Sequence, residues 1–188
     1  MIFARAELAL NLLLPDGSVR STPVAATVVN PLTPRHCRAL HRWQETLRTH
    51  GEEDAAWNWE QMLAETGGRA EKAFQTFALV CRRDVQGAMI LETRSRRSRM
   101  ARRGVVYVEY VAVAPWNRAT IQRPPRFRGC GTALIDAARA CSRTVGRGGA
   151  LALHSKEGAR PFYERLGFVD LGSDEAEGGL HYFELEPR

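Results

Sequence analysis

The chain has 188 residues, is 44% hydrophobic and carries a formal net charge of +6. This length is enough to bury one sizeable core, and we expect a single domain over residues 1–188. No stretch reaches the roughly 20 consecutive apolar residues of a membrane-spanning helix. Arg5 and Glu7 also interrupt the apolar start where a signal peptide needs its core. We therefore expect a cytoplasmic protein with no membrane partner.

The four cysteines, Cys37, Cys81, Cys130 and Cys141, show no paired spacing such as Cys-x-x-Cys. This pattern argues against both a zinc site and a disulfide framework. We expect no bound metal and a reducing compartment.

The first 30 residues predict a β-hairpin. Residues 2–13 are mostly apolar, Asp16-Gly17 is a turn signal, and residues 24–29 are rich in β-branched side chains. A short helix over 8–14 fits the same apolar run, because periodicity alone does not separate the two.

Residues 33–50 predict an amphipathic helix. Thr33 is an N-cap candidate, Pro34 suits the first helical position, and Gly51 ends the segment. Apolar residues recur at helical spacing between these signals, so one face of the helix is expected to be buried.

A second helix is predicted from about residue 53 to residue 66, ending at Gly67-Gly68. On such a helix Trp57 and Trp59 lie about 200° apart around the axis. They cannot both face one core, so one of them is expected to face solvent, a partner or a substrate.

Residues 74–81 and 85–93 read as two strands of an antiparallel hairpin, separated by Arg82-Arg83-Asp84. The next ten residues, 94–103, form an arginine-rich segment that predicts a solvated loop. A basic cluster also binds phosphate backbones in a salt-dependent way, although this one lacks interleaved aromatic residues to stack on bases. Its six arginines are Arg94, Arg96, Arg97, Arg99, Arg102 and Arg103.

An apolar strand over 105–114 leads through a basic, proline-broken loop into Gly129 and Gly131, and a helix over about 131–143 follows. Glycine lets the backbone approach a ligand closely, and the first turn of a helix points unpaired N–H groups at an anion. Arg126 and Arg128 add positive charge at the same place. The segment therefore predicts a phosphate site.

The remaining chain predicts a strand over 150–154, a helix over 158–166 ended by Gly167, and strands over 168–171 and 180–185. An acidic turn separates the last two strands. The order of elements is mixed, which indicates an α+β domain with no internal repeat.

Two motifs resemble those of the GNAT (Gcn5-related N-acetyltransferase) superfamily. Arg126-x-x-Gly129-x-Gly131 after an apolar strand is similar to its acetyl-coenzyme A signature, and Ala159-Arg-Pro-Phe-Tyr163-Glu-Arg-Leu-Gly167-Phe168 is similar to its second signature. They stand in the right order, separated by a helix and a strand. The resemblance covers about residues 75–185 and leaves residues 1–22 as an N-terminal extension or strand.

The resemblance implies a GNAT-like fold, a mixed α/β domain with a mostly antiparallel twisted sheet and about four helices. The family's strands 4 and 5, here 105–114 and 150–154, form a parallel pair that splays apart. Acetyl-coenzyme A is implied as the acetyl donor, with its pantetheine arm between these strands. The residues implied in coenzyme binding are Val111, Ala112, Val113, Arg126, Arg128, Gly129, Cys130, Gly131, Thr132 and His154.

The resemblance also implies a reaction, transfer of the acetyl group to a primary amine by direct attack. Glu109 stands where several family members carry a catalytic glutamate, and we expect it to accept the amine's proton. Tyr163 matches the family's general acid, which protonates the coenzyme A thiolate. His154 stands where many members have asparagine, and its imidazole can supplement or replace Glu109 as base.

The loop over 116–125 is longer than the family's usual turn, which leaves open how Trp116, Asn117 and Arg118 are placed. The acceptor is not legible either. A small cationic amine, a peptide and an aminoacyl-tRNA all suit the chemistry. A homodimer is compatible with the N-terminal hairpin.

Two other functions remain open at this point. In one, the fold is a platform for a nucleic-acid-binding protein that uses the arginines of 94–103. In the other, the chain is a coenzyme A sensor without turnover, against which the presence of Glu109 and Tyr163 argues.

Overall fold

The computed structural model describes residues 1–67 and 73–187. The strands form one sheet in the order β6-β1-β2-β3-β4-β5-β7-β9-β8. Its strands are β1 (Ile2–Leu13), β2 (Val19–Val29), β3 (Phe74–Cys81), β4 (Asp84–Glu92), β5 (Val106–Val113), β6 (Phe127–Arg128), β7 (Leu151–Ser155), β8 (Val169–Asp174) and β9 (Leu180–Leu185). The helices are α1 (Pro34–His41), α2 (Gln44–Thr49), α3 (Trp59–Gly67), α4 (Cys130–Thr144) and α5 (Arg160–Arg165).

The mixed architecture confirms the predicted fold class. The β5–β7 pair is parallel. The antiparallel pairs are β1–β2, β1–β6, β2–β3, β7–β9 and β8–β9. All four predicted helical regions are present, the first of them as two helices. No helix among the described residues is both long enough and apolar enough to cross a membrane.

Contacts divide the chain into two compact units. The first contains the chain up to α3, together with Thr76–Met89 and Val111–Ile135. The second contains Ile90–Tyr110 and the chain from Asp136 onward. Each unit is built from segments that are separated in the sequence. That the two make a single domain stays a prediction.

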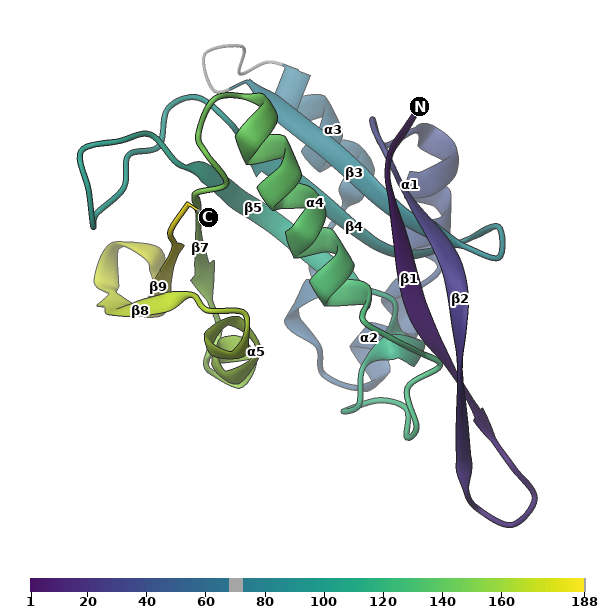
Figure 1. Ribbon diagram of the computed structural model, residues 1–188. Coiled ribbons are helices and arrows are strands. Elements are labelled where there is room, and N and C mark those ends of the chain that lie inside the picture. The colour runs from purple at the N-terminus through teal and green to yellow at the C-terminus, as the bar shows by residue number, and fades with distance from the viewer. Residues whose placement is uncertain (68–72, 188) are drawn as a thin grey trace. The chain divides into compact units, whose positions relative to one another are not determined.

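The N-terminal hairpin is present as a long antiparallel ribbon, β1 with β2, from Ile2↔Val29 to Leu13↔Val19 (Figure 1). The alternative short helix over 8–14 is wrong. Burial fits a strand, since Arg5 and Glu7 are exposed while Leu8 and Leu10 are buried. Side chains two positions apart share a face, as the period of a strand requires.

The first predicted helix is interrupted at Arg42 and Trp43. Thr33 precedes α1 with extended backbone, and its backbone N–H donates to His36 Nδ1 at 3.1 Å. Trp43 is only 2% exposed, and its ring meets that of Trp116 edge to face at 6.1 Å. The interruption places this tryptophan in the core of the first unit.

The second predicted helix is shorter than expected. Residues Glu53–Ala56 form a 3-10 turn, η1, and Trp57 has extended backbone. Asn58 accepts a hydrogen bond from the Gln61 N–H at its side chain, 3.1 Å, so α3 begins at Trp59. Trp57 and Trp59 differ in burial as predicted, with Trp59 buried and Trp57 half-buried, although Trp57 lies outside the helix. The expected stop at Gly68 lies outside the described residues.

The β3–β4 hairpin turns through Arg82 and Arg83, whose φ angles are 50° and 67°. Two successive residues with positive φ make the tight turn that matches the twist of an antiparallel pair. Asp84 opens β4 instead of belonging to the turn. β4 is buried along almost its whole length, as befits a central strand.

Helix α4 is amphipathic as predicted. Leu134, Ile135, Ala138 and Cys141 are all buried, while Asp136 is exposed. In the first unit Leu134 lies over Gly87 of β4, where an added Cβ would stand 2.8 Å from Leu134 Cδ1. Only glycine lets the helix approach the strand this closely.

Candidate active site

The predicted phosphate loop forms an exposed turn at the start of α4. Arg126, Arg128 and Gly129 are exposed, whereas Phe127 and Cys130 are buried and anchor the loop. Gly129 has a φ of +89°, a backbone conformation that favours glycine. The first turn of α4 begins with the bond from the Ala133 N–H to the Gly129 carbonyl, 2.9 Å.

This geometry suits an anion. The backbone N–H groups of Cys130, Gly131 and Thr132 lie in the first turn of α4, where an α-helix leaves its amides without intrahelical partners. The side chains of Arg126 and Arg128 bring two positive charges to the same exposed loop. The Cys130 side chain brings no charge to this turn, because burial raises the pKa of its thiol to about 12 and leaves no thiolate near neutrality.

Neighbouring segments hold the loop in place. The Asn11 N–H of β1 donates to the Arg126 carbonyl at 3.0 Å, and the Asn11 side chain donates to the Pro125 carbonyl at 2.7 Å. β6 pairs with β1 through Ala9↔Arg128 and Leu10↔Phe127. The N-terminal hairpin therefore supports the loop.

The long loop after β5 is ordered by Gln86, a buried residue of β4. Trp116 donates its Nε1–H to Gln86 Oε1 at 2.9 Å, and the Asn117 amide donates to the same oxygen at 3.1 Å. Asn117 Oδ1 then accepts from the Phe127 N–H at 3.0 Å. The side-chain amide of Asn117 thus links β4 to the phosphate loop.

Arg118 sits at the centre of a buried ion cluster that sequence reasoning missed. Its guanidinium binds both carboxylate oxygens of Asp54 and reaches Glu52 at 2.8 Å. Its Nε–H donates to the Val113 carbonyl at the end of β5, 3.1 Å. Burial disfavours its charge, but the hydrogen bonds and charges of Asp54 and Glu52 outweigh it and raise the pKa of Arg118. No local motif signals such partners.

The β5–β7 ladder is short. Its register has two rungs, Val106↔Leu151 and Tyr107↔Ala152, although both strands continue. Within the described residues, Leu153–Ser155 of β7 add no further rung to β5. The ladder ends at Tyr107, two residues before Glu109, which lies on the same face of β5 as Tyr107 because side chains alternate.

Tyr163 lies on α5, which ends in a glycine cap. The Phe168 N–H donates to the Tyr163 carbonyl at 3.1 Å and the Gly167 N–H donates to the Glu164 carbonyl at 2.9 Å, with Gly167 at a φ of +87°. The Tyr163 ring is buried against Phe168 and Phe183, with centroids 5.5 and 5.9 Å away. Burial raises the pKa of Tyr163 to about 12, so its hydroxyl stays protonated near neutrality.

His154 of β7 is buried, with its side chain 4% exposed, and both ring nitrogens have partners. Nδ1 lies 2.6 Å from the Tyr107 hydroxyl and Nε2 lies 3.1 Å from Asp174 Oδ2. In the second unit His154 is thus one member of a polar row that the sequence did not reveal.

The arginine-rich loop 94–103 is held by the second unit's own carboxylates. Arg96 pairs with Glu92 at 3.2 Å, Arg103 pairs with Glu186 at 3.2 Å, and Arg99 pairs with Asp174. Two guanidinium groups also stack on tyrosine rings, Arg96 over Tyr107 at 4.4 Å and Arg99 over Tyr182 at 3.8 Å. The remaining three arginines of the loop, Arg94, Arg97 and Arg102, are exposed.

Comparison with known families agrees with this geometry. The family model described as "Acetyltransferase (GNAT) domain" matches residues 71–186, more than half of the chain. The chain belongs to the GNAT acetyltransferase family. Comparison with curated proteins gave no match.

Solved GNAT structures share the fold. A GNAT-family protein from Desulfovibrio desulfuricans is 18% identical, with a TM-score of 0.63, over 86% of this chain and 98% of that chain. Ard1 from Thermoplasma volcanium is 17% identical, with a TM-score of 0.55, over 85% and 95%. A mutant of the AtaT toxin, bound to the C-terminus of the antitoxin AtaR and to acetyl-coenzyme A, is 20% identical, with a TM-score of 0.55, over 85% and 92%. At these identities the likeness shows the fold alone.

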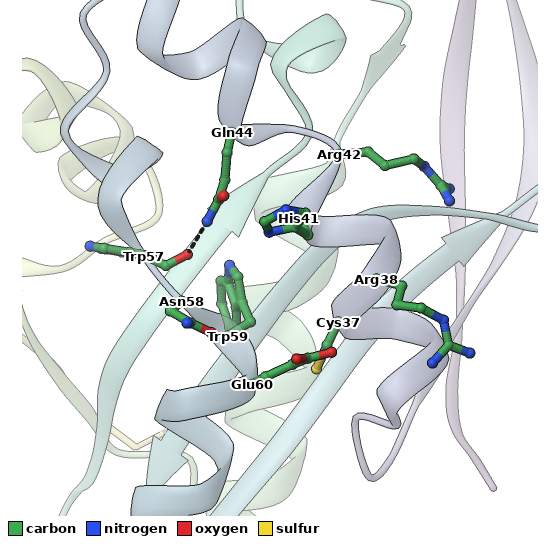
Figure 2. Close-up of a pocket in the computed structure, with 9 residues that line it drawn as sticks. All are labelled: Cys37, Arg38, His41, Arg42, Gln44, Trp57, Asn58, Trp59 and Glu60. Carbon is green, nitrogen blue, oxygen red and sulfur yellow. Dashed lines mark hydrogen bonds between the residues drawn. The ribbon is translucent and has the colours of Figure 1, made fainter.

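The first unit of this GNAT chain also contains an open cavity of about 540 Å³ between α1, α2 and the start of α3 (Figure 2). His41 and Trp59 face each other across it, and Gln44 donates to the Trp57 carbonyl at 3.0 Å along its wall. Its lining residues are Cys37, Arg38, His41, Arg42, Gln44, Trp57, Asn58, Trp59 and Glu60. The cavity includes Trp57 and Trp59, one of which is predicted to face solvent, a partner or a substrate.

Proposed function

We propose that the chain transfers an acetyl group from acetyl-coenzyme A to a primary amine. The observation that carries the proposal is the exposed basic turn Arg126–Gly131 at the start of α4, with Gly129 at positive φ. Backbone amides at a helix start and two guanidinium groups match a pyrophosphate. The family's activity then assigns that pyrophosphate to coenzyme A.

The residues present fit the donor. Arg126, Arg128 and the amides of Gly129–Thr132 would hold the pyrophosphate. The two-rung ladder between β5 and β7 leaves strand edges whose backbone groups need partners, which supports placing the pantetheine arm along β5 at Val111–Val113. Bound acetyl-coenzyme A supplies the activated acetyl group. We assign the N–H of Val113 to the thioester carbonyl, where negative charge develops during attack.

For the reaction to balance, two protons leave the amine nitrogen and one proton joins the departing thiolate. The acceptor arrives as an ammonium ion and must lose one proton before its lone pair can attack. Glu109 attracts this cation and accepts the proton through water. Tyr163, protonated because it is buried, donates a proton to the departing thiolate. The second amine proton leaves as the amide forms and replaces the proton that Tyr163 gave up, so the net products are the N-acetyl compound, the free thiol and the one proton that Glu109 took.

The acceptor class follows from charge. Glu109 favours a cationic amine, as does the acidic turn over 174–177. Three of the six arginines in the loop 94–103 are engaged with carboxylates, which weakens the case for an RNA-linked acceptor or a nucleic-acid platform. Nucleic-acid binding would have to depend on Arg94, Arg97 and Arg102.

The test is direct. Purified protein is incubated with acetyl-coenzyme A and a panel of polyamines, peptides with free N-termini and charged tRNA, and thiol release is followed together with acceptor mass. We expect thiol release only with an amine present and a mass gain of one acetyl group on that amine. Binding of acetyl-coenzyme A without turnover on the whole panel would favour the sensor, and neither binding nor turnover would refute the proposal.

Variants test the roles. Arg126→Ala is expected to weaken coenzyme A affinity with little change in kcat, and Tyr163→Phe to lower kcat with little change in affinity. Arg20→Ala, an exposed arginine of the hairpin, is the matched control for the loss of one positive charge. The opposite pattern in the first two variants would overturn the assignments.

A further inference from the structure

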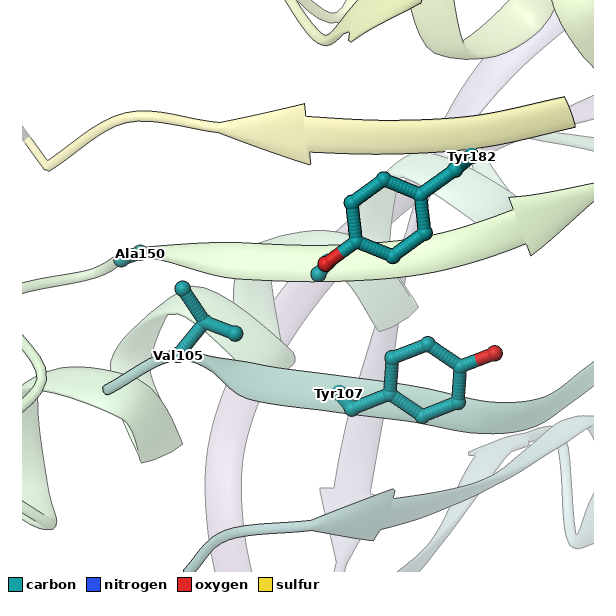
Figure 3. Packing of buried hydrophobic residues seen from close by; sticks show 5 residues of the cluster. Val105, Tyr107, Ala150 and Tyr182 are labelled. Carbon is teal, nitrogen blue, oxygen red and sulfur yellow. The ribbon is translucent and has the colours of Figure 1, made fainter. Parts of the chain in front are cut away.

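A row of hydrogen-bonded side chains joins Tyr107 of β5, His154 of β7 and Asp174 at the end of β8, all in the second unit. The Tyr107 hydroxyl lies 2.6 Å from His154 Nδ1, and His154 Nε2 lies 3.1 Å from Asp174 Oδ2. Figure 3 shows Tyr107 and Tyr182 projecting from the two strands on either side of β7. His154 pairs with Tyr182 across β7 and β9, with ring centroids 4.9 Å apart.

The direction of each hydrogen bond follows from the partners. Asp174 is held as a carboxylate, because the hydrogen bonds from Arg99 and His154 lower its pKa to about 2. A carboxylate only accepts, so His154 donates from Nε2–H. In the neutral ring Nδ1 then carries a lone pair, which accepts the Tyr107 O–H. Burial, with the charge of Glu109 adding to it, raises the pKa of Tyr107 and keeps that proton in place.

Asp174 is itself fixed. Its Oδ1 accepts the Ala176 N–H at 3.1 Å, and Oδ2 receives the Arg99 guanidinium. Arg99 is held in turn by its backbone N–H, which donates to the buried Glu184, and Ser98 donates to the same carboxylate at 2.6 Å. The arginine-rich loop therefore orients the carboxylate that orients His154.

The row lies where the parallel strands part. Tyr107↔Ala152 is the last rung of the β5–β7 ladder, and Glu109 follows two residues later on the same face. The other charged groups that act on Tyr107 are Arg96, stacked on its ring, and Glu177. A hydroxyl, an imidazole bonded to it and a carboxylate that orients the imidazole form the arrangement by which proteins take a proton from a hydroxyl.

We propose that Tyr107, His154 and Asp174 form a proton relay that takes the proton from the ammonium group of the amine substrate. The relay would act as a second base beside Glu109. The inference rests on the proposed acetyl transfer. The ammonium gives one proton to the Tyr107 oxygen while Tyr107 gives its own proton to His154 Nδ1. The products are a neutral amine and an imidazolium paired with Asp174. Tyr107 is the residue that touches the substrate, and His154 and Asp174 act through it.

The experiment compares Tyr107→Phe and His154→Gln with the native protein, using the panel amine that shows the highest turnover. We expect each change to lower kcat at pH 7 by about tenfold, because a positioned base contributes at least that much. The double variant is expected to lose no more than either single variant, since the two residues act as a unit.

Tyr182→Phe is the matched control, because it removes a hydroxyl from the same cluster outside the relay and is expected to leave kcat and its pH profile unchanged. Thermal unfolding of every variant separates activity from stability. Native kcat in His154→Gln, or equal losses of kcat in Tyr107→Phe, His154→Gln and Tyr182→Phe, would overturn the relay.

An NMR measurement decides the arrangement without an acceptor. Nitrogen-15 shifts of the neutral His154 ring in the native protein should show the Nε2–H tautomer, and Tyr107→Phe should move the Nδ1 shift. A proton on Nδ1 of the neutral ring would overturn the relay even if the protein acetylates amines. If turnover is absent with every acceptor, the proposed function fails, and this measurement still tests the relay's geometry.

Discussion

Replacing Arg118 by alanine tests whether the buried ion cluster holds the first unit together. The side chains of Arg118 and Asp54 are only 14% and 9% exposed. Removing the guanidinium leaves the Asp54 carboxylate buried without its main partner, and the Val113 carbonyl loses a donor. Breaking a buried pair in this way costs about 3–5 kcal/mol. Because both groups keep some contact with solvent, we expect about 3 kcal/mol for Arg118→Ala.

The assay is urea unfolding followed by tryptophan fluorescence, since Trp43, Trp57, Trp59 and Trp116 all belong to the first unit. Arg103→Ala removes a more exposed ion pair, with side chains 31% and 59% exposed, and is expected to cost no more than about 1 kcal/mol. The double change Arg118→Met with Asp54→Leu removes both charges and should regain most of the loss. Equal free energies of unfolding for Arg118→Ala and Arg103→Ala would refute the reasoning.

Three further predictions concern stability and reactivity. The pKa of Asp174 is lowered to about 2 in the folded protein, so its carboxylate stabilises the folded state above pH 4 and this stabilisation is lost as the pH falls toward 2. Acid unfolding of Asp174→Asn, followed by circular dichroism, should lack this loss. Gly87→Ala would place a Cβ 2.8 Å from Leu134 Cδ1 and 3.0 Å from the Ala112 carbonyl oxygen; we expect a loss of about 1–3 kcal/mol in urea unfolding, and an unchanged midpoint would contradict the packing. The Cys130 thiol should resist a thiol reagent at pH 8 and react once urea unfolds the chain, as mass spectrometry of the labelled peptide will show; rapid labelling of the native protein would contradict its burial.

Local signals predicted the hairpins, the helix after the glycine turn and the phosphate loop, because each depends on residues close together in sequence. The N-cap of α3 was also present in the sequence, as Asn58, but the apolar pattern from residue 53 obscured it. The 3-10 turn at Glu53–Ala56 was not predictable, since Arg118 holds Asp54 from 64 residues away. The same limit applies to the break before Trp43, which packs on Trp116.

The candidate site divides in the same way. Glu109, Tyr163 and the residues of the phosphate loop could be proposed from motifs, and their roles stay predictions. The bond between Tyr107 and His154 joins residues 47 positions apart, and the bond from His154 to Asp174 joins residues 20 positions apart. No spacing rule brings three such residues together. Only the pairing of β5, β7, β9 and β8 does so.

The pairing of β1 with β6 connects the N-terminal hairpin to the loop that we propose binds the donor. A ligand that binds the ordered phosphate loop must stabilise the strand beside it, and the coupling is reciprocal by thermodynamic necessity. Coenzyme A should therefore slow amide hydrogen exchange at Asn11, whose N–H bonds to the Arg126 carbonyl. Conversely, a shortened chain that begins at residue 71, where the family model begins, would lack this strand. It should bind the donor more weakly even though it keeps every residue of the loop.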